Sequence, residues 1–565
     1  MALALTLTAG AWPGGAALAE GPYGAYLAGR QAVAAHDYQQ ISDYMTRALA
    51  RDPSNPQFME AVATASLSLG MLERALPVAH RMEAAGIASQ AGRMALVAEL
   101  IQTGQYGDLL ARIDDDRAVG PLVDALLAGW AHLGNGAVAD ALAAFDALSE
   151  DGGLSGFAFY HKALALASVG DFEGAEAILA ASQGGPLQGL RRAVLARATI
   201  LSQLDDSAGA LDLLDAAFAD DTDAEVAALR ARLKAEGQVP FDAITGVPDG
   251  MAEVFYTIAM ALSGEARDDY TLLFARMAEI LRPDHGDATL LSAQFLERLD
   301  QFELAEETYR QIAPDAPLYL VAQLGRAEAL RRLDRLDEAA ALLDRLTDSF
   351  PETALIHVTR GDLLRQNKDF DAAAEAYTRA LALQDGDRPQ DWFIYYARAI
   401  SHERTGNWPE AEADFRQALA LNPGQPQVLN YLGYSLVERQ EKLDEALAMI
   451  EEAVAARPDS GYIVDSLGWV YFRLGRYDEA VEQMERAAEL MPVDPVVNDH
   501  LGDVYWATGR KREAEFQWRR ALSFHGTGDT SDDVDPDRIR RKLEVGLDQV
   551  LDEEGAPPLG SRDAD

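Results

Sequence analysis

Residues 461–492 read GYIVDSLGWVYFRLGRYDEAVEQMERAAELMP, and this stretch decides the fold. Counted from Gly461, its small, bulky and helix-ending residues are Gly468 (position 8), Gly475 (15), Tyr477 (17), Ala480 (20), Met484 (24), Ala487 (27) and Pro492 (32). Small residues at positions 8, 20 and 27 let two helices approach closely, and the bulky residue at position 24 fills the remaining volume. Glycine at position 15 and proline at position 32 end helices. The stretch therefore predicts a closely packed helix pair.

The same pattern recurs along the chain with a period of 34 residues. The clearest units start at Ala252, Gly286, Leu320, Ala354, Trp392, Pro426, Gly461 and Pro495, and weaker units start at Pro22, Pro56, Gln90, Leu122, Gly156 and Arg191. A single helix pair cannot bury its own apolar face, so such units stack on their neighbours. The sequence predicts an all-α solenoid of about fourteen helix pairs, a right-handed superhelix with a long concave face.

Breaks in the repeat pattern divide the chain into parts. The predicted parts are, in chain order, a divergent N-terminal sub-array (22–219), a joint (220–251), a regular C-terminal sub-array (252–524), a capping helix (535–552) and a disordered tail (553–565). The joint holds one predicted helix, 223–236, and is then rich in glycine and proline. Asp535 before Pro536 is typical of a helix start, which places the capping helix.

The N-terminal residues are apolar and end in an A-x-A motif, Ala17-Leu18-Ala19. This pattern predicts a signal peptide over residues 1–19 and export to the periplasm or cell envelope, although the usual basic start is missing and the first positive residue is Arg30. The alternative is an apolar lead-in to the first helix of a cytoplasmic protein. No later stretch reaches the ~18 consecutive apolar residues that a transmembrane helix needs.

Charge and cysteine content exclude several functions. The chain of 565 residues has 92 Asp and Glu against 49 Lys and Arg, a formal net charge of −43. Such a surface repels phosphate, so nucleic acids and anionic lipid are poor partners, and proteins with basic patches are better ones. Because cysteine is absent, disulfides, thiolate metal sites, cysteine nucleophiles and a lipidated N-terminal cysteine are excluded.

The sequence carries no recognisable catalytic motif. Phosphate loops, HExxH, GxSxG and strand-borne GxGxxG motifs are all missing, and the nine histidines are dispersed. Asp533, Asp535, Asp537 and Glu544 mimic a calcium loop, but Arg538 stands where that loop requires glycine. We therefore predict no catalytic residues, no metal and no cofactor. An enzyme with a site in the joint is the least favoured alternative, since the joint is too short for a catalytic domain.

The predicted partner-binding site is the concave side of the last four units. Positions 2, 5, 9 and 12 of each first helix should face this groove. Those side chains are Phe393, Tyr396, Ile400, Glu403, Gln427, Asn430, Tyr434, Val437, Tyr462, Asp465, Trp469, Phe472, Val496, Asp499, Asp503 and Trp506; all but Ile400, Glu403, Gln427, Val437 and Val496 are predicted contacts. Aspartates between aromatic rings favour a partner segment with Lys or Arg beside apolar side chains. The alternative, that rings merely pack between helices, stays open for Trp469 and Trp506.

Several motifs resemble a known family. LNYLGY (429–434), DSLGW (465–469), GRYDEA (475–480) and HLGDVYW (500–506) resemble tetratricopeptide (TPR) repeats of bacterial cell-envelope proteins, specifically over 425–524. Some members of that group are outer-membrane lipoproteins that bind a periplasmic carboxyl-terminal-processing protease and deliver substrates to it. The resemblance implies a TPR-type α-solenoid that acts as an exported, non-catalytic scaffold or adaptor and recruits proteins, including a protease and its substrates. The alternative is a cytosolic assembly or regulatory protein.

Two features of such proteins are missing from this chain. Outer-membrane lipoproteins of the family carry a lipid-accepting cysteine, and this chain has none. Cytosolic TPR cochaperones hold a C-terminal carboxylate with Lys, Asn and Arg at the inner positions. Here Asp465, Asp499 and Asp503 stand at those positions, so the sequence does not predict that clamp.

Overall fold

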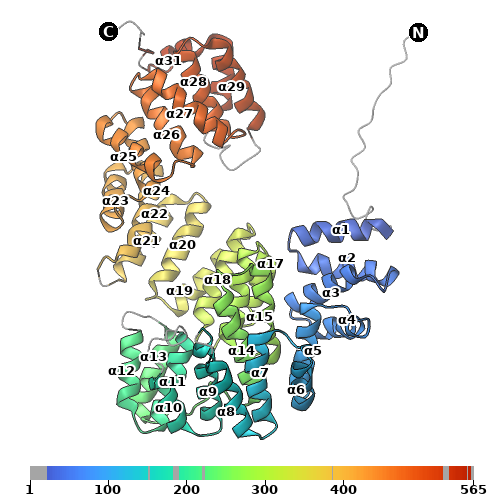
Figure 1. Ribbon diagram of the computed structural model, residues 1–565. Coiled ribbons are helices and arrows are strands. Elements are labelled where there is room, and N and C mark those ends of the chain that lie inside the picture. The colour runs from blue at the N-terminus through green and yellow to red at the C-terminus, as the bar shows by residue number, and fades with distance from the viewer. Residues whose placement is uncertain are drawn as a thin grey trace, which may run out of the picture. The chain divides into compact units, whose positions relative to one another are not determined.

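The computed structural model describes residues 22–150, 153–181, 190–218, 223–384, 386–525, 534–556 and 558–560. The predicted signal peptide lies outside these ranges, as do residues 561–565 of the predicted tail. The described residues form 31 α-helices and one 3₁₀ turn, in two compact units over 1–342 and 343–565 (Figure 1). The predicted all-α, TPR-type solenoid is therefore confirmed.

The first unit contains eighteen complete helices among its described residues. They are α1 (Pro22–Ala34), α2 (Tyr38–Arg51), α3 (Pro56–Ser68), α4 (Leu72–Ala84), α5 (Gln90–Gln102), α6 (Tyr106–Asp114), α7 (Pro121–Gly134), α8 (Val138–Ser149), α9 (Ser155–Ser168), α10 (Phe172–Ala181), α11 (Arg191–Gln203), α12 (Ser207–Ala217), α13 (Ala224–Glu236), α14 (Val247–Leu262), α15 (Asp268–Leu281), α16 (Gly286–Arg298), α17 (Phe302–Tyr309) and α18 (Tyr319–Arg332). Except for α13 and α18, they form pairs from α1–α2 to α16–α17, and the helix predicted in the joint is α13.

Helix α19 (Leu336–Ser349) crosses from the first unit into the second. The remaining elements are α20 (Ala354–Gln366), α21 (Phe370–Ala382), η1 (Pro389–Asp391), α22 (Trp392–Arg404), α23 (Trp408–Leu421), α24 (Pro426–Glu438), α25 (Leu443–Ala456), α26 (Gly461–Arg473), α27 (Tyr477–Leu490), α28 (Pro495–Ala507), α29 (Lys511–Phe524), α30 (Pro536–Val545) and α31 (Leu547–Glu553). Each pair from α20–α21 to α28–α29 is one predicted unit.

Small residues at position 8 make room for the bulky residue at position 24 of the same unit. A Cβ atom added to Gly361 would lie 2.6 Å from the Tyr377 ring, and one added to Gly468 would lie 2.8 Å from the Met484 side chain. Both distances are shorter than van der Waals contact. The two helices of a pair are therefore held together by the spacing that the sequence predicted.

The turn at position 15 is left-handed whether or not it holds glycine. Gly475 has φ of 75°, and Asp334 and Lys368 have φ of 58° and 60° at the same position of their units. This conformation ends the first helix of each pair. Glycine reaches it without steric cost, whereas other residues are strained there.

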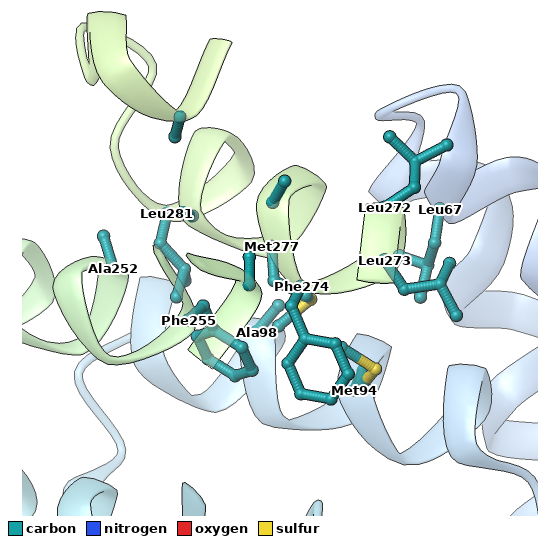
Figure 2. Packing of buried hydrophobic residues seen from close by; sticks show 14 of the residues in the cluster. Leu67, Met94, Ala98, Ala252, Phe255, Leu272, Leu273, Phe274, Met277 and Leu281 are labelled. Carbon is teal, nitrogen blue, oxygen red and sulfur yellow. The ribbon is translucent and has the colours of Figure 1, made fainter. Parts of the chain in front are cut away.

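The first unit folds back on itself, which the sequence did not predict. Helices α14 and α15 pack against α3, α5, α7 and α9, the first helices of four earlier pairs (Figure 1). Figure 2 shows Phe255 of α14 and Phe274 and Met277 of α15 against Met94 and Ala98 of α5, all buried. The chain's own helices thus fill the hollow that we expected to stay free.

The predicted joint at 220–251 does not coincide with the boundary between the units. The helices on both sides of it belong to the first unit, and the boundary falls between Leu342 and Leu343. The physical reason is visible in α5, where the five consecutive residues 94–98, which point to all sides of the helix, are buried. A helix that is apolar on every side must be covered all round, and α14 and α15 provide the cover.

A buried polar network holds α14 to α9, α11 and α16. The carboxylate of Glu253 on α14 accepts hydrogen bonds from Arg192 Nη2 at 2.8 Å and from the Tyr160 hydroxyl at 2.8 Å, and it lies 3.2 Å from His285 Nε2. Burial alone raises the pKa of Glu253, but Arg192 and His285 hold this pKa well below its usual range. The network therefore carries a paired charge that fixes α14 in place.

Candidate functional site

The residues predicted to bind a partner lie on one face of the second unit. We call it the first-helix face, the side chains at positions 2, 5, 9 and 12 of α20, α22, α24, α26 and α28. Neighbouring first helices pack side by side, α20 on α22, α24 on α26 and α26 on α28. This packing brings side chains about 34 residues apart in sequence onto adjacent helices.

Apolar side chains are exposed at position 2 of this face. The exposed fractions are 54% for Leu355 on α20, 38% for Phe393 on α22 and 44% for Tyr462 on α26. Leu355 was not among the predicted site residues, although its place in the unit that starts at Ala354 identifies it. Tyr396, at position 5 of α22, is half-buried and packs its ring edge-on to Tyr431. We call Leu355, Phe393 and Tyr462 the exposed row.

Position 5 carries buried polar side chains beside this row. Asn430 on α24 is 3% exposed and Asp465 on α26 is 6% exposed. Among the described residues, neither the Oδ1 atom of Asn430 nor that of Asp465 has a hydrogen-bond partner. Partial burial raises the pKa of Tyr462, and a hydrogen bond from the Asn430 side chain opposes this rise. The face therefore holds two acceptor oxygens that lack a donor in the part of the chain that the structure describes.

Trp469 and Phe472 belong to the packing between helices. The Trp469 ring stacks on His500 of α28 at 4.1 Å and on Phe472 at 4.9 Å, and its Nε1 donates to Glu438 at 2.6 Å. Both rings are 9% exposed. Tyr434 is also half-buried, between the clusters on either side of it. The Trp469 ring therefore packs between neighbouring helices, which is the alternative that the sequence left open.

His500 pairs with the other oxygen of Asp465. Its Nδ1 lies 2.9 Å from Asp465 Oδ2. Burial lowers the pKa of His500, but Asp465 and the nearby Asp499 and Asp503 raise it, so the pKa ends above its ordinary value. A protonated His500 is thus favoured where the first-helix face is most acidic.

Asp499, Asp503 and Trp506 are covered by the chain itself. We call residues 534–556 and 558–560 the C-terminal segment. Lys542 of this segment lies within 2.9 Å of Asp499 and Asp503, and Trp506 Nε1 donates to Asp548 at 2.8 Å. Three of the predicted partner-binding residues therefore bind residues of α30 and α31.

The predicted single capping helix is two helices. Asp535 caps α30 as predicted, because its side chain accepts from the backbone N–H groups of Asp537 and Arg538. Gly546 then breaks the helix with φ of 87° where its backbone meets the Trp506 ring. A residue with a Cβ would collide with that ring. The helix break and the contact with Trp506 therefore both favour glycine at position 546. Asp533 of the calcium-like motif lies outside the described residues.

A cavity of about 990 Å³ lies at the N-terminal end of the first unit. Tyr26, Arg30 and Val33 of α1 line it together with Phe58 of α3, and Arg267 before α15 lies at its edge. Tyr26, Arg30 and Val33 hold positions 5, 9 and 12 of the first predicted unit. The cavity is therefore a part of the first unit's hollow that the start of α15, with Asp269, lines but does not fill.

The part of the chain that the structure describes contains no cluster of three or more His, Asp or Glu placed to hold a metal ion. None of the described helices has the length and apolar character needed to span a bilayer.

Stacked helix pairs with a small residue at position 8 and a left-handed turn at position 15 define a TPR-repeat α-solenoid protein. The tetratricopeptide repeat family model matches residues 324–388, 396–461, 435–495 and 466–524. Tetratricopeptide repeats are protein-interaction modules and are generally not catalytic. Residues 324–388 and 396–524 therefore match the tetratricopeptide repeat, and the helix pairs of the other described residues share its architecture.

Known proteins resemble parts of this chain. The TPR repeat-containing protein PA4667 of Pseudomonas aeruginosa is 31% identical over 173 residues, which are 30% of this chain and 28% of that protein. Cellulose synthase operon protein C of Pseudomonas fluorescens is 30% identical over 175 residues, 30% of this chain and 13% of that protein. Among solved structures, the Cut9–Hcn1 hetero-tetramer matches with a TM-score of 0.39 and 16% identity over 93% of this chain and 96% of the matched chain. The matched residues span less than a third of the length of PA4667 and of cellulose synthase operon protein C.

Proposed function

We propose that this protein is a non-catalytic scaffold that binds a partner polypeptide along the exposed row of the second unit. The observation that carries the proposal is the exposure of Leu355, Phe393 and Tyr462 on a face that is covered elsewhere in the chain. Large apolar side chains that line up on one face of a repeat array are typical of a binding surface.

The chain itself shows what this face accepts. In the first unit, α15 covers Met94 and Ala98, which hold positions 5 and 9 of α5. In the second unit, the C-terminal segment covers the corresponding positions of α28, Asp499 and Asp503. Both occupants are helices that present one face. A partner helix with apolar side chains on one side can cover the exposed row in the same way.

Polar groups beside the row define the rest of the partner. Buried acceptors without a donor cost about 1–3 kcal/mol each, and such groups persist where a ligand satisfies them. Asn430 and Asp465 are two such acceptors. Donors on the partner, either Lys or Arg side chains or free backbone N–H groups, complement them and suit the acidic surface.

We further infer that the scaffold works in the bacterial cell envelope, where a protease and its substrates are among its partners. The apolar residues 1–19 with their A-x-A motif support export, and the motifs of 425–524 support the adaptor role. Sequencing the N-terminus of the native protein tests the location. Cleavage after Ala19 supports export, and an intact N-terminus favours the cytosolic alternative.

The binding proposal is tested by a double variant and a control variant. Partners captured by the full chain are identified, and their affinity is measured for Phe393→Asp with Tyr462→Asp and for the control Phe516→Asp. Phe516 is 59% exposed but lies on α29, a second helix. We expect the double variant to bind about tenfold more weakly or worse, and the control to bind normally. Equal affinity of all three proteins would contradict the proposal.

A further inference from the structure

The C-terminal segment inserts a fully buried cation into the first-helix face of α28. The Lys542 side chain is 0% exposed. Its Nζ lies 2.9 Å from both carboxylate oxygens of Asp499 and 2.6 and 2.8 Å from those of Asp503. Ile539 and Leu547, on either side of Lys542 in sequence, are completely buried. The segment thus binds through one fully buried lysine between apolar anchors, and Arg538 Nη1 lies farther away, 3.6 Å from Asp503 Oδ2.

The face of α28 is built to receive such a cation. Asp499 and Asp503 are four residues apart and therefore lie on the same side of the helix. Two buried carboxylates repel each other, and each needs a cation or a proton. Burial raises the pKa of Asp499, and repulsion from the Asp503 carboxylate raises it further. The charge of Lys542 lowers the same pKa in part. The Trp518 indole donates to Asp503 at 2.9 Å and orients that carboxylate.

The segment also extends toward the preceding pair. Trp506 Nε1 donates to Asp548 at 2.8 Å, and the backbone N–H of Gly560 donates to the Tyr477 hydroxyl at 2.9 Å. Leu559 packs on the cluster that contains Trp469 and Phe472. The segment therefore covers α28 and reaches the start of α27, in the manner of a bound ligand.

We propose that Asp499, Asp503 and Trp506 form a binding site for an amphipathic helix that carries a lysine between apolar residues. The C-terminal segment is the in-chain ligand of this site, and a partner helix with the same pattern replaces it there. This site is separate from the exposed row, because it lies on α28 and is filled by a segment of the same chain. It also identifies the partner's chemistry from an occupant that the structure contains.

A fluorescent synthetic peptide of residues 534–560 tests the proposal without any outside partner. It is titrated into the wild-type full chain and into a full chain with Ile539→Asp and Lys542→Glu, which disable the chain's own segment. The control is Arg541→Glu, because Arg541 is 43% exposed and pairs with Glu544 and Glu553 of the same segment. We expect the disabled chain to bind the peptide about tenfold more tightly than the wild type or the control.

Two more titrations show which groups make the site. A peptide that carries K542E should not bind the disabled chain, and adding Asp499→Asn and Asp503→Asn to that chain should also abolish binding. The peptide variant leaves the protein unchanged, so its result holds even if the asparagine variants fold poorly. Failure of the wild-type peptide to bind the disabled chain, or equal binding of the K542E peptide, would overturn the proposal. Neither result bears on the exposed row.

Discussion

Replacing Gly250 by alanine tests whether α14 packs on α7 as the structure shows. Gly250 lies in the first turn of α14, and a Cβ added there would overlap the Trp130 indole. That ring cannot move aside, because it is fully buried, its Nε1 donates to His161 Nδ1 at 3.3 Å, and it packs edge-on to Phe145. Overpacking costs about 1–3 kcal/mol, and the better helix propensity of alanine offsets at most about 1 kcal/mol. We expect a net loss of about 1–2 kcal/mol.

The measurement is urea unfolding followed by circular dichroism, with hydrogen exchange of the α14 and α15 amides to assign the loss to the first unit. Gly107→Ala is the matched control. Gly107 lies in the first turn of α6, and a Cβ there meets no atom within 4 Å. This control should gain up to about 1 kcal/mol. If Gly250→Ala gains stability as Gly107→Ala does, α14 does not lie on Trp130 and the self-filled first unit is wrong.

Three further predictions concern buried contacts. Gly502→Ala should destabilise the second unit by about 1–3 kcal/mol in thermal unfolding, because the new Cβ meets Trp518. Glu253→Gln should cost the first unit about 3 kcal/mol in urea, since it weakens the pairing of the buried Arg192. Burial lowers the pKa of His161 to about 4 from its ordinary value of about 6.5. Because the unfolded chain takes up this proton first, the contribution of His161 to the stability of the first unit should be constant above pH ~6.5 and fall by up to about 3 kcal/mol toward pH ~4. A pH profile left unchanged by His161→Gln would contradict this assignment.

The helix pairs follow from local features of the sequence, and their assembly does not. Gly468 and Met484 are sixteen residues apart in sequence, and this spacing alone predicts that they meet. The repeat pattern says nothing about where an array turns back on itself. In the first unit that information lies in the composition of helices such as α5, whose apolar residues cover every side. An alternation of apolar and polar sides would have indicated an open hollow.

The sequence predicted which kinds of side chain bind the site, but not which segment binds there. Aspartates next to aromatic rings favoured a lysine beside apolar side chains, and the structure supplies such a segment, around Lys542, from the same chain. Its docking on Asp499 and Asp503 depends on tertiary contacts across more than 35 residues. Local sequence patterns do not encode such contacts. Leu355 lies outside the predicted site because that site covers only the last four units, although Leu355 holds the same position of its own repeat.

The exposed row sets a limit on how tightly a partner can bind through apolar contact alone. Burying one such side chain fully contributes about 1.5–3 kcal/mol, so Leu355, Phe393 and Tyr462 together supply at most about 9 kcal/mol. Association costs on the order of 4–15 kcal/mol before any net affinity appears. A tight partner must therefore also use the acceptors of Asn430 and Asp465. It follows that Asn430→Leu, which keeps the volume but removes the acceptor and the hydrogen bond to Tyr462, should weaken a tight partner. The control is Tyr462→Phe, which loses only that hydrogen bond, and isothermal titration with the captured partner measures the difference. An unchanged affinity would mean that the partner's donors lie elsewhere on the face.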